Sequence, residues 1–252
     1  MTPFLTRPIA HRAFHDLAAG RPENSRAAIS AAIAAGYAIE IDIQISADGR
    51  AMVFHDYDLG RLTPETGAIG QRPADELSAI PLKGGDEGIP TLREVLALVA
   101  GRAPLLIEIK DQDGALGADV GPLEQAVAEE LAGYAGAVAL MSFNPHSVAA
   151  LAEAAPDLPR GITTCGYAAE HFPLLPESTR AHLRGIPDFE RVGASFISHA
   201  AADLDHPRVH ELKARGVPVL CWTIRTEEAE NHARRFADNI TFEGYAAAHP
   251  PA

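Results

Sequence analysis

Short β-like runs alternate with Ala- and Leu-rich helical runs along nearly the whole chain of 252 residues. Strands that alternate with helices are typical of βαβ units, whose strands lie parallel in one sheet. We expect β-like runs at 8–11, 37–45, 51–54, 104–110, 137–142, 159–163, 194–198, 218–223 and 239–242. We expect helices at 25–35, 92–99, 123–132, 145–154, 207–215 and 227–237. The pattern predicts an α/β protein with a mainly parallel sheet.

One of these nine runs is connected differently from the others. An Asp-Gly pair at 48–49 separates the second run from the third, which is a strong hairpin signal. If this pair forms a two-residue turn, counting outward sets Asp42 opposite His55. The run 51–54 is then an antiparallel return, and eight parallel strands remain, the number of a (β/α)8 barrel. An open doubly wound sheet is the alternative, but no GxGxxG follows the first run to favour it.

The length of the chain suits a single barrel domain, since α/β barrels run to about 200–250 residues. Residues 56–101 are long for one barrel connection, and Gly and Pro occur throughout them. Long structured connections often serve as lids or binding loops. We therefore expect residues 1–252 to form one TIM-barrel domain, with 56–101 as a small insertion or lid after the second strand.

Charge and cysteine content exclude several classes of protein. The chain has 21 Lys and Arg against 34 Asp and Glu, a net charge of −13, whereas nucleic-acid binding needs clustered basic residues. Cys165 and Cys221 form no CxxC pair, so no thiolate metal site or disulfide is indicated. No signal-peptide pattern opens the sequence, and no apolar run approaches the ~18 residues of a membrane span. We expect a cytoplasmic protein without stable membrane anchoring; its oligomeric state is not indicated.

Carboxylates interrupt two of the most apolar runs. Glu40 and Asp42 alternate with isoleucines, so both side chains point to one face of their strand, and Glu108 and Lys110 alternate in the same way. Carboxylates in buried strands are costly unless positive charge compensates them. A salt-bridge network that closes the barrel is one explanation. Three carboxylates against one lysine leave surplus negative charge, which favours a bound cation, and oxygen ligands suit Mg²⁺ or Ca²⁺.

Histidines and further cations are expected near these carboxylates, because reactive groups gather at the C-terminal ends of barrel strands. His11 and Arg12 end the first run, and the hairpin count brings His55 beside Asp42. Two histidines that flank a metal can divide general base and general acid roles near neutral pH. Arg12 as a bidentate fork and Lys110 as a point charge can hold a phosphate.

Other residues near the strand ends carry weaker signals. Trp222 lies in the run 218–223 and is a candidate apolar pocket wall, with core packing as an equal alternative. Asn24 is interpreted as a helix cap, and residues 142–145 as a helix start. No GxSxG elbow of a serine hydrolase occurs. The remaining weak candidates are Ser142, His15, His146 and His199.

The sequence resembles the glycerophosphodiester phosphodiesterase family, whose fold is a (β/α)8 barrel. The resemblance lies in the segments AHRAFHD, GRPENSRAAISAAIAAGYAIEIDIQISADGRAMVFHD, IPTLREVL, LLIEIK, MSFNP and VLCWTI, which follow in order from residue 10 to residue 224. The residues that match the family's functional positions are His11 and His55 as acid and base, Glu40, Asp42 and Glu108 as metal ligands, and Arg12 and Lys110 as phosphate contacts.

Three positions depart from the family pattern. Ala13 stands where the family commonly has glycine, so the backbone there has less freedom. The family's PENT is PENS at 22–25. The family's ITD-x-P near the C-terminus reads Ile-Thr-Phe-Glu-Gly at 240–244, which leaves the role of that Asp open. Glu243, one position further on, is a candidate to replace it.

The resemblance implies metal-dependent hydrolysis of a small glycerophosphodiester to sn-glycerol 3-phosphate and an alcohol. One histidine deprotonates the glycerol 2-hydroxyl, which attacks phosphorus to form a cyclic phosphate, while the other protonates the leaving alcohol; water then opens the ring. The first base, the head group, and the choice between Mg²⁺ and Ca²⁺ stay open. One alternative is phospholipase D-like cleavage of lysophospholipid or sphingomyelin head groups. Another is a non-catalytic barrel that binds phosphate or metal, against which the histidine pair argues.

Overall fold

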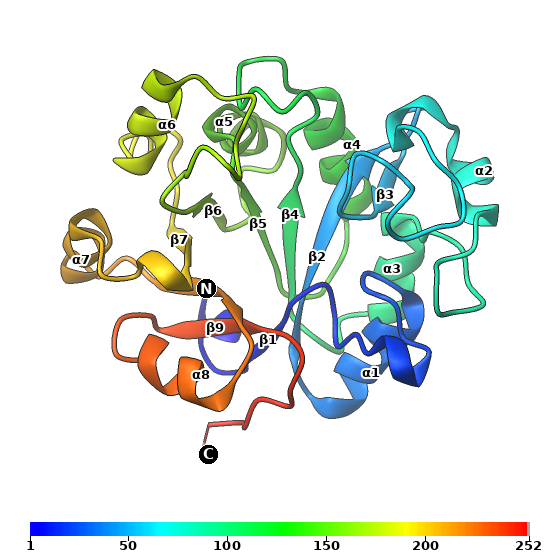
Figure 1. The fold of residues 1–252 in the computed structure, drawn as a ribbon, viewed down its shortest axis with the longest axis horizontal. Coiled ribbons are helices and arrows are strands. Elements are labelled where there is room, and N and C mark those ends of the chain that lie inside the picture. The colour runs from blue at the N-terminus through cyan, green and yellow to red at the C-terminus, as the bar shows by residue number, and fades with distance from the viewer. Residues whose placement is uncertain (251–252) are drawn as a thin grey trace.

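The computed structural model describes residues 1–250, and within them eight parallel strands close into a barrel (Figure 1). The strands follow the order β1-β9-β8-β7-β6-β5-β4-β2, and β1 pairs again with β2 to complete the ring. The predicted (β/α)8 barrel is therefore confirmed, and the open sheet is excluded. The barrel strands are β1 (Ile9–Ala10), β2 (Ala38–Ile45), β4 (Leu105–Ile109), β5 (Val138–Ser142), β6 (Arg160–Thr164), β7 (Phe196–Ala200), β8 (Val219–Ile224) and β9 (Asn239–Phe242).

Helices surround this ring of strands (Figure 1). They are α1 (Arg26–Ala35), α2 (Ala74–Ala79), α3 (Leu92–Val99), α4 (Pro122–Leu131), α5 (Pro145–Ala154), α6 (Glu177–Arg184), α7 (Pro207–Ala214) and α8 (Glu227–Ala233). The sequence pattern misses α2, which has only six residues, and α6, in which only Leu183 is buried, so neither presents a clear apolar stripe. Among residues 1–250, no helix combines the length and the apolar content that a bilayer span requires.

The strand β3 (Ala51–Val53) pairs antiparallel with β2, as the hairpin signal predicts. The turn between them differs from the prediction by one residue. The N–H of Ser46 donates to the carbonyl of Arg50 at 3.0 Å, so three residues form the turn instead of two. Gly49 closes it with a φ of +79°, the left-handed conformation typical of a three-residue hairpin loop.

This change of register corrects one expectation about the site. Across the hairpin, Asp42 lies opposite Phe54, whose N–H donates to the Asp42 carbonyl at 2.9 Å. The prediction that His55 lies opposite Asp42 is wrong, since a slip of one residue turns the paired side chains to the other face. His55 lies one position further on, beyond the end of β3, and from there it lines the cavity described below.

The segment that follows β3 has a small apolar core of its own, and β3 and α2 lie together at one side of the barrel (Figure 1). Two residues on or next to β3, Met52 and Phe54, join this core and attach it to the barrel. The other members are Leu59, Ile69, Ala74, Leu77, Ile80, Leu82 and Ile89. A role of residues 56–101 as a lid stays a prediction.

The barrel interior changes from apolar to polar along its axis. At the N-terminal end, Phe4 packs into the barrel beside Ile9, Phe196 and Leu220. Asn239 holds the segment that carries Phe4, because its amide donates to the Phe4 carbonyl at 2.8 Å. At the C-terminal ends of the strands, carboxylates replace these apolar side chains. The apolar plug therefore leaves only this end of the barrel for polar chemistry.

Candidate active site

A cavity of about 150 Å³ opens at the C-terminal end of the barrel. All seven residues predicted for the site line it, and Trp222 lines it as well. A larger hollow of about 710 Å³ on the outside of the barrel, between α3 and α4, contains none of them. The full lining of the first cavity is His11, Arg12, Glu40, Asp42, His55, Glu108, Lys110, Met141, Phe143, Trp222, Thr223, Arg225 and Thr241.

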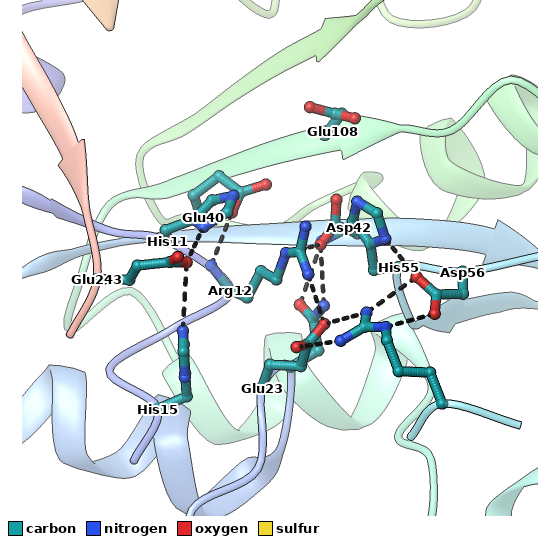
Figure 2. Close-up of polar contacts among 12 residues, drawn as sticks. His11, Arg12, His15, Glu23, Glu40, Asp42, His55, Asp56, Glu108 and Glu243 are labelled. Carbon is teal, nitrogen blue, oxygen red and sulfur yellow. Dashed lines mark hydrogen bonds and ion pairs between the residues drawn. The ribbon is translucent and has the colours of Figure 1, made fainter. Parts of the chain in front are cut away.

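Three carboxylates converge in this cavity, as predicted. Glu40 and Asp42 lie on β2, and Glu108 lies beside Asp42 in the register of β2 with β4. One oxygen from each of the three lies within 4.8 Å of the others (Figure 2). All three residues are buried, with exposed fractions of 1%, 2% and 7%. An oxygen-only donor set of this size fits a hard divalent cation.

The charge balance of the three carboxylates also fits a cation. Burial, together with the negative charges of Asp42 and Glu108, holds the pKa of Glu40 well above its usual value. Burial acts in the same direction on Asp42, but the positive charges of His55 and Lys110 outweigh it and lower the pKa of Asp42. The local cations thus compensate Asp42 and leave Glu40 without full compensation. A divalent ion would supply the missing positive charge.

Lys110 lies between two of these carboxylates. Its Nζ is 2.7 Å from Oε1 of Glu108 and 3.5 Å from Oδ1 of Asp42. Burial opposes the charge on Lys110, but the two carboxylates outweigh burial and raise its pKa. Lys110 is therefore a fixed cation at the edge of the carboxylate cluster.

Asn24 positions a candidate metal ligand, which corrects its interpretation as a helix cap. Its Nδ2 donates to Oδ2 of Asp42 at 2.9 Å, and the N–H of Asp42 donates to Oδ1 of Asn24 at 3.2 Å. The cap of α1 is the next residue, Ser25, whose Oγ accepts from the N–H of Ala28 at 3.0 Å. The left-handed backbone of Asn24, with a φ of +58°, aims its amide inward while Ser25 begins the helix.

The segment after β1 has an unusual backbone. Both Arg12 and Ala13 adopt left-handed conformations, with φ values of +51° and +65°. In this path the N–H of Arg12 donates to Oε2 of Glu40 at 2.8 Å, and the N–H of Ala13 donates to the Glu40 carbonyl at 2.9 Å. The segment thus keeps at Ala13 a conformation that favours glycine, and it uses that conformation to bind a candidate metal ligand.

His11 is held by Glu243, a carboxylate whose role the sequence leaves open. Its Nδ1 lies 2.5 Å from Oε2 of Glu243, which follows β9, and His15 Nε2 lies 3.5 Å from the same oxygen (Figure 2). The other oxygen of Glu243 lies 2.7 Å from Nη2 of Arg225. Burial lowers the pKa of His11, although the hydrogen bond to Glu243 opposes this effect. Burial opposes the charge on Glu243, but the hydrogen bond from His11 and the nearby ring of His15 lower its pKa.

His55 has the same kind of support on the other side of the cavity. Its Nδ1 lies 2.6 Å from Oδ1 of Asp56, and Nε of Arg61 donates to Oδ2 of Asp56 at 2.6 Å. Burial opposes the charge on Asp56, but hydrogen bonds from His55 and Arg61 lower its pKa. Each histidine therefore contacts a carboxylate through Nδ1, and each carboxylate contacts an arginine. In both, Nε2 is the ring nitrogen left for the cavity.

Glu23, which sequence reasoning missed, joins the two arginines beside the cavity. Arg12 donates to Oε1 of Glu23 at 2.7 Å (Figure 2). Arg61 donates to both Glu23 oxygens at 2.8 Å. The Nε of Arg12 lies 3.6 Å from Oδ2 of Asp42, and within residues 1–250 this buried atom has no hydrogen-bond partner. Glu23 is part of the PENS segment, so that motif carried a signal for it.

An aromatic wall forms another side of the cavity. Trp222 lines the cavity and also packs edge-on against Phe143, with ring centroids 5.4 Å apart. Its indole N–H donates to the Ser198 carbonyl at 3.1 Å. Trp222 is partly buried between the cavity and this aromatic cluster, and its role as a pocket wall stays a prediction. In contrast, His199 is fully buried against Thr164 and does not line the cavity.

Comparisons with known proteins agree with this architecture. Residues 11–240 match the glycerophosphoryl diester phosphodiesterase family. A glycerophosphodiester phosphodiesterase of Caldanaerobacter subterraneus subsp. tengcongensis is 29% identical over 235 residues, which cover 87% of each chain. An Oleispira antarctica phosphodiesterase, solved with its product sn-glycerol-3-phosphate, is 25% identical with a TM-score of 0.78, over 97% of this chain and 95% of that one. The fold of a Parabacteroides distasonis glycerophosphodiester phosphodiesterase is also similar, with a TM-score of 0.72 and 21% identity over 94% and 92% of the two chains.

Fold and family match together define a barrel phosphodiesterase. The chain belongs to the glycerophosphodiester phosphodiesterase family, as the resemblance in its motifs predicts. The class of activity of this family is hydrolysis of a phosphoric diester, which favours an enzyme over the non-catalytic barrel. The roles of the individual residues stay predictions, although the structure brings all seven of them to one cavity.

Proposed function

We propose that this protein hydrolyses glycerophosphodiesters to sn-glycerol 3-phosphate and an alcohol, with His11 and His55 as the general acid and the general base. One observation carries the proposal. Two histidines, each oriented by a carboxylate, share a cavity with three buried carboxylates and two fixed cations. The product bound to the Oleispira antarctica relative supports the same reaction.

The phosphate group would bind between Arg12 and Lys110. The buried Nε of Arg12, which has no hydrogen-bond partner within residues 1–250, offers a donor to a phosphoryl oxygen, and Lys110 adds a compact positive charge. Glu40, Asp42 and Glu108 would hold Mg²⁺ or Ca²⁺, which would neutralise charge on the phosphoryl oxygens. Together these cations would stabilise the negative charge that grows as phosphorus is attacked.

The histidines would divide the proton transfers. In the first step Nε2 of one histidine accepts the proton of the glycerol 2-hydroxyl, whose oxygen forms a bond to phosphorus. Nε2 of the other histidine gives a proton to the alcohol oxygen as its bond to phosphorus breaks. In the second step the roles reverse: water loses a proton to the second histidine and attacks phosphorus, and the first histidine protonates the 2-oxygen as the ring opens.

The deciding experiment measures release of sn-glycerol 3-phosphate from glycerophosphodiesters of choline, ethanolamine, glycerol and inositol. We expect release that requires Mg²⁺ or Ca²⁺ and stops with EDTA. His11→Ala and His55→Ala should each lower kcat at least ~100-fold, because each removes a general acid or base. His210→Ala is the control, since this exposed histidine pairs with Asp205 on the outer surface.

Two other outcomes would redirect the assignment. If no glycerophosphodiester is cleaved but a lysophospholipid is, the phospholipase D-like alternative replaces this proposal. If the histidine variants keep near-normal turnover, the two-histidine mechanism is wrong even though the substrate class stands.

A further inference from the structure

A second hollow, of about 310 Å³, lies at the same end of the barrel as the catalytic cavity. It is formed by the loop after β3, the segment around Ile69, the loop after β4, and Leu174 from the loop after β6. We call it the Tyr57 groove. Its lining residues are Gln44, Tyr57, Ala68, Ile69, Gly70, Gln71, Gln112, Asp113, Gly114 and Leu174.

Hydrogen bonds connect the Tyr57 groove to the catalytic cavity. Nε2 of Gln44 donates to the carbonyl of His55 at 3.0 Å, and Nε2 of Gln112 donates to the carbonyl of Lys110 at 2.5 Å. The two glutamines also bond to each other at 3.0 Å. Their amides therefore bridge the backbones of two residues whose side chains line the catalytic cavity. Tyr57 is two positions beyond His55, and Gln112 is two positions beyond Lys110, so the loops after β3 and β4 each contribute residues to both hollows.

The lining of the groove combines apolar surface with one negative charge. Tyr57 and Leu174 are two of the three large apolar side chains exposed among residues 1–250, with exposed fractions of 47% and 73%. Asp113 is the single charged residue of the lining, which contains no Lys, Arg or His. Exposed apolar residues gathered in a hollow are typical of a binding surface. This hollow would therefore attract a group that is positively charged and partly apolar.

The far side of the catalytic cavity carries an ion pair between Arg225 and Glu243. Arg225 lines that cavity directly after β8, and β8 stands across the barrel from β4, whose following loop carries Asp113. The negative charge of Asp113 is therefore not repeated at Arg225 on the opposite side, where the positive charge of Arg225 compensates Glu243. A diester whose two ends differ in charge would bind in one orientation, with its cationic end toward the groove.

We propose that the Tyr57 groove binds the leaving alcohol and favours cationic amino alcohols, of the choline or ethanolamine type, over neutral polyols. This inference rests on the proposed function. The ring face of Tyr57 attracts an ammonium group, Asp113 adds a negative charge, and Leu174 covers the carbon atoms of the alcohol. A neutral polyol gains neither the charge interaction nor the ring contact.

The test compares kcat/KM for glycerophosphocholine and glycerophosphoethanolamine with kcat/KM for the glycerol and inositol diesters. Wild-type protein should prefer the cationic substrates, and added salt should weaken the preference. Asp113→Asn keeps the oxygen that accepts from the N–H of Ala115 and removes the charge; Tyr57→Leu keeps apolar volume and removes the ring. Each should lower kcat/KM about 2- to 5-fold for the cationic substrates only.

Asp205→Asn is the matched control, since it makes the same change in net charge on α7's side of the molecule, where Asp205 contacts His210. Wild-type protein that cleaves the diesters without a cationic preference overturns the groove proposal and leaves the proposed function standing. Asp113→Asn and Tyr57→Leu proteins that lose activity equally on all four substrates also overturn it. Absence of cleavage of every diester by wild-type protein overturns the proposed function itself.

Discussion

Nε of Arg61 lies 2.6 Å from Oδ2 of Asp56, and the same guanidinium donates to both oxygens of Glu23 at 2.8 Å. Asp56 contacts Nδ1 of His55, and Glu23 contacts the guanidinium of Arg12. Arg61 thus connects the carboxylate that holds His55, a proposed acid/base residue, to the carboxylate that holds Arg12, a proposed phosphate-binding residue. Arg61 touches neither group directly, so its contribution would be to position them.

We predict that Arg61→Gln lowers kcat by about 10-fold or more, a size typical of supporting partners in metal sites. The amide cannot reach Asp56 and Glu23 together, so both lose a fixed partner. Arg72→Gln is the control, because Arg72 pairs with Glu65 and Glu76 and lines no part of the cavity. Equal kcat in the two variants would show that the contacts of Arg61 do not matter for turnover.

Two adjacent residues, Asn24 and Ser25, offer a second matched pair. Asn24→Ala removes the amide that holds Asp42, so we expect the Mg²⁺ or Ca²⁺ concentration for half-maximal activity to rise about 10- to 100-fold. Ser25→Ala removes the cap of α1 and should cost about 1 kcal/mol of the free energy of unfolding, with the metal requirement unchanged. Metal titrations of activity and urea unfolding separate the effects. A normal metal requirement in Asn24→Ala would contradict the positioning role.

Glu243 leads to a prediction about pH and stability. Its pKa in the folded protein lies below the ordinary 4.5, because the hydrogen bond from His11 and the nearby ring of His15 outweigh the effect of burial. The unfolded chain therefore binds the proton more readily. The stabilisation is fully present above about pH 4.5 and is lost as the pH falls through the lowered value.

Glu243→Gln keeps the size of the side chain but removes this titration. Urea unfolding at about pH 7 and about pH 3.5 should give a difference in free energy between wild type and variant that shrinks at the lower pH. Glu230→Gln serves as the comparison, since Glu230 is a buried carboxylate that pairs with Arg234 outside the cavity. A difference that stays constant with pH would mean that the charge of Glu243 does not stabilise the fold.

The sequence predicts which residues line the cavity better than it predicts which residues hold them in position. The reason is that closure of the barrel brings distant parts of the chain together. Alternation along single strands places Glu40 and Asp42 on one face, so local pattern suffices for the candidate metal ligands. The contact of His11 with Glu243 joins residues 232 positions apart, and only the pairing of β1 with β9 brings them together. The residue periodicity within a single strand or helix cannot predict a contact between residues so far apart in the sequence.

The hairpin shows a second limit of sequence reasoning. An Asp-Gly pair correctly predicts an antiparallel return, but it does not distinguish a two-residue turn from a three-residue turn closed by a left-handed Gly49. The predicted register is therefore wrong by one residue, although His55 still reaches the cavity from beyond β3. The prediction for Asn24 is wrong for a similar reason, because asparagine is common at helix caps and only its φ of +58° reveals the inward amide.

The division of roles between the two histidines can be decided by changing the leaving group. A p-nitrophenyl ester of glycerol 3-phosphate loses a weakly basic phenolate, which leaves without a proton from the enzyme. The variant that lacks the general acid of the first step should therefore recover much of its kcat/KM on this substrate, whereas the variant that lacks the base should not. His11→Ala and His55→Ala are compared on the p-nitrophenyl and choline diesters, with p-nitrophenol and choline, the alcohols released in the first step, as the measured products. Recovery by His55→Ala alone assigns His11 as the first base, and recovery by His11→Ala alone assigns His55. Recovery by neither would mean that protonation of the leaving group does not limit the first step, and the proposed acid role in that step would then be wrong.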